Sequence, residues 1–116
     1  MLSIKEKGIL LYIIDYCKRI ENKVHDLSYD DFVRSQDVIE IVCFNIFQIG
    51  ELAKGLSNEF VDKHDRIPWK YIKGMRDRIG HGYGSLDLKQ VWNTATNDVK
   101  PLMDYCETII DESQQN

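Results

Sequence analysis

The sequence predicts an all-α fold, an up-and-down bundle of four to five helices. In every long segment the apolar residues recur at helical spacing, and no stretch of useful length alternates as a strand does. Only two prolines and seven glycines occur in 116 residues, which favours a few long elements over many short ones. A chain of this length can bury one hydrophobic core. We therefore predict a single helical domain over residues 1–110 and a polar tail over residues 111–116.

The first helix is predicted over residues 4–24. Its apolar residues form a one-sided stripe at positions 10, 13, 14, 17, 20 and 24. The motif "SYDD" at 28–31 then has the pattern of a capping box, with Ser28 as the N-cap and Asp31 three residues later. A short second helix is expected around Phe32.

The next segment, "DVIEIVCFNIFQIGELAKGL" at 37–56, is predicted to be a helix that is apolar on almost every side. Such a helix has to be buried on almost every side, and a domain of this size hardly covers the whole circumference of one helix. The simplest arrangement places one face in the bundle and the other face against a second copy of the chain. We therefore predict a homodimer; the alternative is a helix at the centre of the bundle.

Two further helices are predicted in the C-terminal half. Pro68 suits the first position of a helix, and Gly80 or Gly82 is a natural end for it. The last helix is expected to begin within residues 86–88. Because Pro101 lies inside that helix and lacks a backbone donor, we expect a kink or a break about two residues before it.

Charge is unevenly distributed along the chain. The formal net charge of −4 argues against nonspecific attraction to nucleic acid. Residues 63–81, however, contain six Lys or Arg and two Asp, a local balance of +4. A local patch of this kind can hold phosphate groups. The alternative is an ordinary solvated helix face.

Cysteine usage and hydropathy indicate a cytoplasmic protein. Cys17, Cys43 and Cys106 are far apart, form no C-x-x-C pair and lie in apolar helical patterns, which is typical of buried free thiols in a reducing compartment. The apolar run "ILLYII" at 9–14 is broken by Asp15. It is too short for a signal peptide or a membrane span, so no association with a membrane is expected.

The stretch "GMRDRIGHGYGSLD" at 74–87 places Arg76, His81 and Tyr83 among glycines. Cleavage of RNA without a metal needs a base for the 2′-hydroxyl, an acid for the leaving oxygen and a fixed positive charge for the phosphorane-like transition state. Histidine transfers protons near neutral pH. Arginine binds phosphate oxygens with a planar fork and keeps its charge. The pair therefore has the chemistry that RNA cleavage requires.

The spacing of this pair restricts how it can work. Five residues turn an ideal helix by about 140°, so Arg76 and His81 do not share a helix face. They can converge if the helix ends between them at Gly80, or if a two-fold axis brings two copies of the pair into one cleft. The alternative role for His81 is to cap the last carbonyl groups of the helix.

The motif has a particular set of neighbours. "IGELAK" at 49–54 and "IPW" at 67–69 precede Arg-Asp-x-x-x-His-x-Tyr at 76–83, and "LD" at 86–87 and "VW" at 91–92 follow it. From about residue 5 to 110, the sequence resembles HepT-like proteins of the HEPN superfamily. Those proteins are ribonuclease toxins of two-gene type VII toxin–antitoxin modules.

The resemblance implies a helical homodimer in which Arg and His of both chains line one cleft and cut RNA without a metal. Arg76 and His81 then correspond to the catalytic pair, with Asp77 as the supporting polar residue. Tyr83 corresponds to the tyrosine to which the partner antitoxin, a minimal nucleotidyltransferase of the MntA type, attaches AMP. Two residues depart from the family pattern. Asp77 stands where Asn is frequent, and Gly84 stands where a bulky apolar residue is frequent.

Three further charged residues are candidates for the site. Glu51 matches the family block "GE" and is expected to pair with Arg76 or Arg78, since a carboxylate in such an apolar helix needs a partner. The alternative is an exposed Glu at the end of the helix. Lys73 and Arg78 are candidate RNA contacts, with ordinary surface charge as the alternative.

The remaining histidines and the tryptophans predict no further site. His25 and His64 have no partners at metal-ligand spacing, so both are expected on the surface and neither a metal nor another cofactor is expected. Trp69 and Trp92 lie on apolar stripes and are expected in the core.

Three functions are compatible with this sequence. The first is a metal-independent endoribonuclease toxin, with His81 as general acid/base and Arg76 stabilising the transition state. The second is a non-catalytic helical subunit that binds nucleotide and docks a minimal nucleotidyltransferase. The third is a helical dimer with a structural role only. The intact Arg/His pair favours the enzyme, because a docking subunit has no need of both residues.

Overall fold

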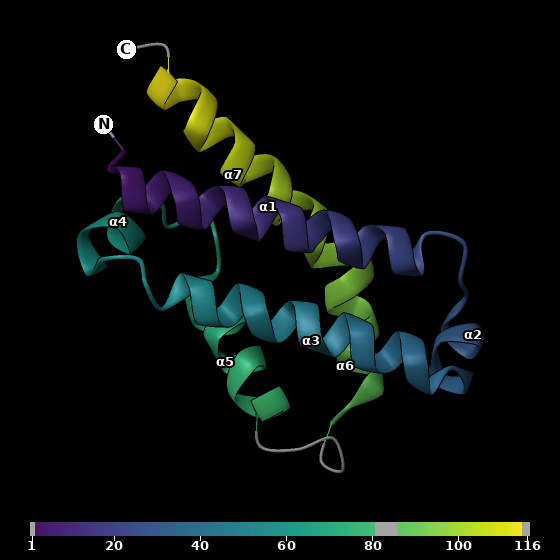
Figure 1. Ribbon diagram of the computed structural model, residues 1–116. Helices are drawn as coiled ribbons and strands as arrows, with labels where there is room; N and C mark the ends of the chain where they lie inside the picture. Colours follow the sequence, from purple (N-terminus) through teal and green to yellow (C-terminus); the bar gives the residue numbers. More distant parts are fainter. Residues whose placement is uncertain (1, 81–85, 115–116) are drawn as a thin grey trace.

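The computed structural model describes residues 2–80 and 86–114, and within these ranges the chain forms a bundle of helices without a strand (Figure 1). The predicted all-α fold is confirmed. Four longer helices form the frame of the bundle, and short helices connect them. The elements are α1 (Ile4–Val24), α2 (Tyr29–Arg34), α3 (Gln36–Ala53), α4 (Asn58–Lys63), α5 (Trp69–Gly80), α6 (Leu88–Asn93), the π-helical turn η2 (Thr94–Asp98) and α7 (Val99–Gln114).

Serine side chains cap the N-termini of several of these helices. At the start of α2, Ser28 Oγ accepts a hydrogen bond from the Asp31 amide at 3.1 Å, and the Asp31 carboxylate accepts one from the Ser28 amide at 3.0 Å. This is the predicted capping box, and its two hydrogen bonds lower the pKa of Asp31. Ser3 forms the equivalent box with Glu6 at the start of α1. Local sequence therefore determines where these helices begin.

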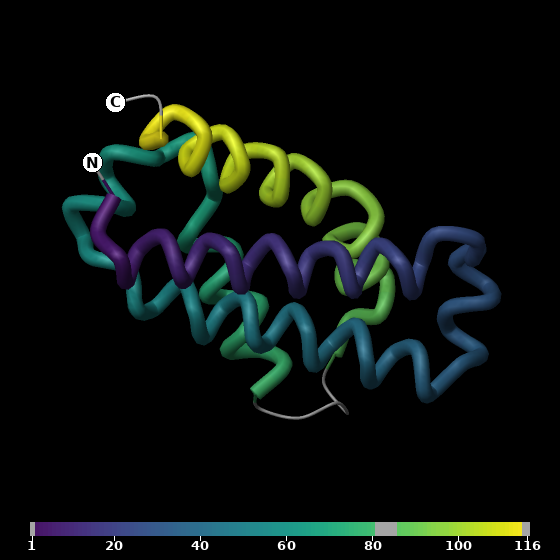
Figure 2. Tube along the Cα trace, turned by 45° about the horizontal axis from the view of Figure 1, so that its top comes forward, coloured from purple at the N-terminus to yellow at the C-terminus, as the bar shows by residue number. Residues whose placement is uncertain are grey.

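The longer helices lie in the order α7, α1, α3, α5 across the bundle (Figures 1 and 2). α1 and α3 form the central pair, α7 packs on α1, and α5 packs on α3. The predicted buried thiols are confirmed, since Cys17, Cys43 and Cys106 are all buried and free. Burial raises the pKa of Cys43 to about 11 and that of Cys106 to about 12. No helix in the described ranges combines the length and the apolar character that crossing a membrane requires.

Helix α3 has one buried face and one exposed face, although its sequence is apolar on most sides. One face, which includes Val42, Ile46 and Ile49, is buried in the core. On the opposite side Phe44 is 54% exposed. The alternative of a helix buried all round is therefore wrong, and the outward apolar face that we predicted exists. Its covering by a second copy stays a prediction.

The helical hydrogen-bond pattern changes from α to π just before Pro101. The π turn η2 lies between α6 and α7 and ends at Asp98. Proline lacks an N–H and its ring crowds the carbonyl four residues earlier, so a wider turn relieves the clash. The expected disturbance therefore takes the form of a π turn. α7 continues to Gln114, so residues 111–114 of the predicted tail are helical, and the Leu2 amide donates to Ser113 Oγ at 3.4 Å.

The prediction for the histidine at 64 holds only in part. His64 is half-buried: its ring lies against Phe60 with centroids 4.5 Å apart, and burial lowers its pKa. His25 is exposed as predicted. Trp69 is buried, and Trp92 is half-buried against the core, so both belong to the apolar interior.

Candidate active site

The candidate site lies where α5 crosses α3 (Figure 1). Gly50 of α3 makes this crossing close. A Cβ at Gly50 would lie 2.3 Å from Cβ of Arg76 and 3.3 Å from the carbonyl oxygen of Ile72. Only a residue without a side chain lets the two backbones approach in this way. As a result, Arg76 projects from α5 over the surface of α3.

The guanidinium of Arg76 is held on three sides. Its Nε donates to the Glu51 carboxylate, and its Nη1 donates to Asp77 Oδ1 at 3.1 Å. Beneath it lies the ring of Phe47, with the guanidinium carbon 4.7 Å from the ring centroid. The hydrogen bond to Glu51, with a smaller contribution from Asp77, raises the pKa of Arg76. The arginine is therefore a permanent and oriented cation.

Lys54 extends this group into a cluster of four charges. Its Nζ lies 3.6 Å from Glu51 Oε1 and 3.7 Å from Asp77 Oδ1. Among the described residues, no hydrogen-bond acceptor binds Nη2 of Arg76, so this nitrogen can donate to a phosphate oxygen. Sequence analysis missed both Lys54 and Phe47. Their signal was the spacing of 47, 51 and 54, which places all three side chains on one face of a helix.

The candidate cations of α5 differ in their partners and in their exposure to solvent. Glu51 was expected to pair with Arg76 or Arg78, and Arg76 is its partner. Arg78 is two residues further on, about 200° around the helix, and is exposed. Lys73 is half-buried. Neither Lys73 nor Arg78 forms an ion pair with another described residue, so their contact with RNA stays a prediction.

His81 and Tyr83 lie outside the described residues. The described part of α5 ends at Gly80, where a Cβ would lie 3.5 Å from Arg76 Nη1 and 3.3 Å from the Phe47 ring. The end of α5 is therefore beside the Arg76 guanidinium. The placement of His81 and Tyr83 relative to Arg76 stays a prediction. Within the described ranges, no three His, Cys, Asp or Glu side chains gather as a metal site.

Comparison with known proteins assigns the chain to a family. The family model described as "Ribonuclease HepT-like" matches residues 13–109. The chain belongs to the HepT-like ribonuclease family. This membership confirms the resemblance that the motif order indicated, and the matched range includes both α3 and α5, which carry the charge cluster.

Named relatives of this HepT-like chain come from several prokaryotes. A protein named "Putative RNase" from Caldanaerobacter subterraneus subsp. tengcongensis is 30% identical over 105 residues, which cover 90% of this chain and 94% of the relative. "Probable ribonuclease HepT" from Thermococcus cleftensis is 29% identical over 96 residues, covering 83% and 87% respectively. A longer Methanocaldococcus jannaschii protein, "Gamma-glutamylcyclotransferase and putative RNase", is 33% identical over 110 residues, covering 95% of this chain and 50% of the relative. No solved structure matches the HepT-like chain significantly.

Proposed function

We propose that this chain is a cytoplasmic, metal-independent endoribonuclease toxin that cleaves RNA through Arg76 and His81. The observation that carries the proposal is the Arg76 side chain, which Glu51 orients near the end of α5, five residues before the motif histidine in the sequence. A planar guanidinium with one nitrogen that no described residue engages suits a phosphodiester, because it can stabilise negative charge that grows on the phosphate oxygens.

The reaction is an internal transesterification. His81 takes the proton of the 2′-hydroxyl while that oxygen attacks phosphorus, so the O2′–P bond forms and the P–O5′ bond breaks. The proton passes from an imidazolium to the leaving O5′, which becomes a 5′-hydroxyl. The other product is a 2′,3′-cyclic phosphate. Arg76 stabilises the negative charge of the phosphorane-like transition state. Glu51 acts as a positioning residue that fixes the direction of the guanidinium.

An RNA-cleavage assay in the presence of EDTA tests this proposal. The purified chain is incubated with a mixed-sequence single-stranded RNA, and the product ends are analysed by mass spectrometry. Cleavage is expected to persist in EDTA and to leave 2′,3′-cyclic phosphate and 5′-hydroxyl ends. Cleavage that requires added Mg²⁺, or 5′-phosphate ends, contradicts the mechanism.

A specific observation favours the non-catalytic alternative. Asp77, which stands where the family often has Asn, accepts a hydrogen bond from Arg76 Nη1. An incoming phosphate has to compete with this carboxylate for the guanidinium. A subunit that docks a minimal nucleotidyltransferase and binds nucleotide would tolerate such competition better, because it does not have to stabilise the extra charge of a transition state. The same cleavage assay separates the two functions, because the docking subunit leaves the RNA intact under every condition.

We propose that a homodimer completes the cleft, and that its interface is the α1/α3 face, formed by Tyr12 and Tyr16 of α1 and Phe44 and Gln48 of α3. Tyr12 is 61% exposed and Phe44 54% exposed, so this face presents two aromatic side chains to solvent. Gln48 Nε2 donates to Tyr16 Oη at 3.3 Å across the two helices. A shallow hollow lined by Tyr12, Tyr16, Gln48 and Glu51 extends this face to the partner of Arg76. A second copy on this face would therefore approach the charge cluster.

Replacing Phe44 by Glu is expected to convert the dimer to a monomer. The substitution puts a charge into the proposed α1/α3 face, where an apolar contact would be lost and a carboxylate would be desolvated. Ile4→Glu is the matched control, because Ile4 is 93% exposed at the start of α1 and outside this face. Light scattering after size exclusion reports the mass, and circular dichroism reports the helix content. An unchanged mass for Phe44→Glu rejects this interface.

We further propose that an MntA-type nucleotidyltransferase antitoxin silences the toxin by attaching AMP to Tyr83. A bulky anionic nucleotide beside His81 would fill the cleft and repel RNA phosphates. The Tyr83→Phe variant is expected to stay toxic when the antitoxin is co-expressed, since it lacks the phenol oxygen that accepts AMP. Mass spectrometry of the wild-type chain from the same cells is expected to show one or more added AMP groups on Tyr83. An unmodified, silenced wild-type chain would show that neutralisation works by another route.

A further inference from the structure

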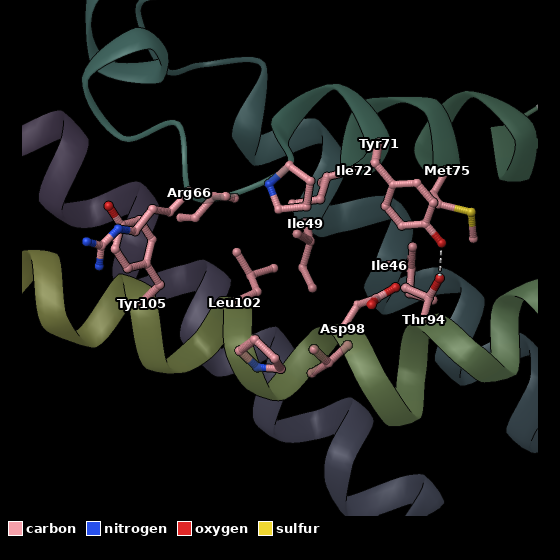
Figure 3. A pocket seen from close by; sticks show the side chains of 14 residues that line it. Ile46, Ile49, Arg66, Tyr71, Ile72, Met75, Thr94, Asp98, Leu102 and Tyr105 are labelled. Atoms are coloured by element: carbon pink, nitrogen blue, oxygen red, sulfur yellow. Dashed lines mark hydrogen bonds between the residues drawn. The ribbon is translucent and has the colours of Figure 1, made fainter.

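A second hollow in the molecule is separate from the charge cluster. It has a volume of about 140 Å³ and lies between α3, α5 and the segment formed by η2 and α7 (Figure 3). Its walls are mainly aliphatic side chains: Ile46 and Ile49 from α3, Ile72 and Met75 from α5, and Val99 and Leu102 near the start of α7. The hollow is partly open to solvent, so a small molecule can reach these apolar walls from the surface.

The backbone around the hollow is built from unusual elements. The chain has only two prolines, and both Pro68 and Pro101 line this one cavity. Because proline has no N–H, the backbone at these two positions presents no donor to the hollow. The π turn Thr94–Asp98 contributes Thr94 and Asp98 to the lining. π turns within helices occur frequently at functional sites.

Polar groups are confined to the two ends of the hollow (Figure 3). At one end Tyr71 Oη and Thr94 Oγ1 lie 2.7 Å apart and satisfy each other, with Asp98 beside them. At the other end the Arg66 guanidinium carbon lies 5.9 Å from the centroid of the Tyr105 ring. No carboxylate of the described residues is within ion-pair distance of Arg66. Arg66 and Asp98 are both exposed, so one end of the hollow carries a solvent-accessible cation and the other a solvent-accessible carboxylate.

We propose that this hollow is a binding site for a small aromatic carboxylate. An engineered apolar cavity of about 150 Å³ holds benzene, so a hollow of this volume has room for one aromatic ring. The ring lies among Ile49, Ile72 and Leu102, and the carboxylate of the ligand meets Arg66. Asp98 at the far end repels the carboxylate and so sets the orientation. An apolar pocket with a few placed polar groups is the usual form of a small-molecule site. This site does not depend on the proposed ribonuclease activity.

Titration of the ¹⁵N-labelled full chain with phenylacetate, followed by amide chemical shifts, tests the site. Saturable shifts are expected for residues that line the hollow on α5, η2 and α7. Phenylacetamide, which keeps the ring but lacks the charge, is expected to bind about tenfold more weakly, and Arg66→Gln to weaken phenylacetate binding by about the same factor. Arg34→Gln, an exposed arginine at the end of α2, is the matched control and leaves the affinity unchanged.

A filled hollow gives an independent check. Leu102→Phe places a ring inside the cavity and is expected to abolish the shifts; if that variant fails to fold, Ile72→Phe fills the same space from a half-buried position. The proposal is overturned by shifts that do not saturate, by equal affinity of the wild type and Arg66→Gln, or by binding that survives in a folded, filled variant. A change of oligomeric mass on adding phenylacetate would also overturn it, because a second copy of the chain would then be the natural occupant.

Discussion

His81→Ala is expected to reduce RNA cleavage by about 100- to 10,000-fold and to abolish toxicity to the cell. The imidazole is the only group of the motif that can accept and return a proton near neutral pH, so water has to replace it in both steps. Single-turnover cleavage of a labelled RNA measures the rate. Circular dichroism and light scattering are expected to show unchanged helix content and oligomeric state.

His25→Ala is the control for this variant. His25 is exposed and its Nδ1 lies 2.8 Å from the adjacent Asp26 carboxylate, far in sequence from the motif. Its replacement is expected to leave the cleavage rate within a factor of two or so, because surface substitutions away from a site change little. If His81→Ala cleaves RNA as fast as His25→Ala, the catalytic assignment is wrong.

Gly50→Ala is expected to destabilise the fold and to impair cleavage together. The added methyl group would lie 2.3 Å from Cβ of Arg76, an atom that cannot move without its helix. α5 therefore has to shift away from α3, and overpacking of this kind costs about 1–3 kcal/mol of unfolding free energy. The shift also moves the guanidinium away from Glu51, so the loss of activity should exceed what the remaining folded fraction explains.

Gly74→Ala provides the matched comparison on α5. A Cβ at Gly74 meets nothing within 4 Å, so the substitution only improves helix propensity. It is expected to raise the unfolding free energy by about 0.5–1 kcal/mol. Urea denaturation followed by circular dichroism measures both variants. Equal and small effects from the two substitutions would show that the α3–α5 contact is not as close as described.

The helices were predictable where the signal is local. The side chains of Ser28 and Asp31 each accept a hydrogen bond from the other residue's backbone amide. Because this happens within four residues, the capping box could be recognised without tertiary information. The form of the disturbance before Pro101 was not predictable in this way. A kink, a break and a π turn all relieve the proline clash, and packing between α7 and its neighbours selects among them.

The candidate site was predictable in its residue types but not in its contacts. Glu51 could reach either Arg76 or Arg78 from sequence alone, because the choice depends on how α5 is rotated against α3. Gly50 settles that rotation by allowing the backbone of α3 to meet Arg76. Lys54 enters the cluster only through this crossing. The spacing of 47, 51 and 54 indicates that these side chains share a helix face, but only the tertiary structure shows that this face meets α5.

The central claim is that two protomers share one cleft in which Arg76 and His81 act together. The most direct test uses a heterodimer of one Arg76→Ala chain and one His81→Ala chain, purified through two different affinity tags. Each homodimeric variant lacks one of the two groups entirely, whereas the heterodimer retains one arginine and one histidine on different protomers. We expect the heterodimer to recover cleavage well above both homodimers. A heterodimer as inactive as its parents would contradict a shared cleft.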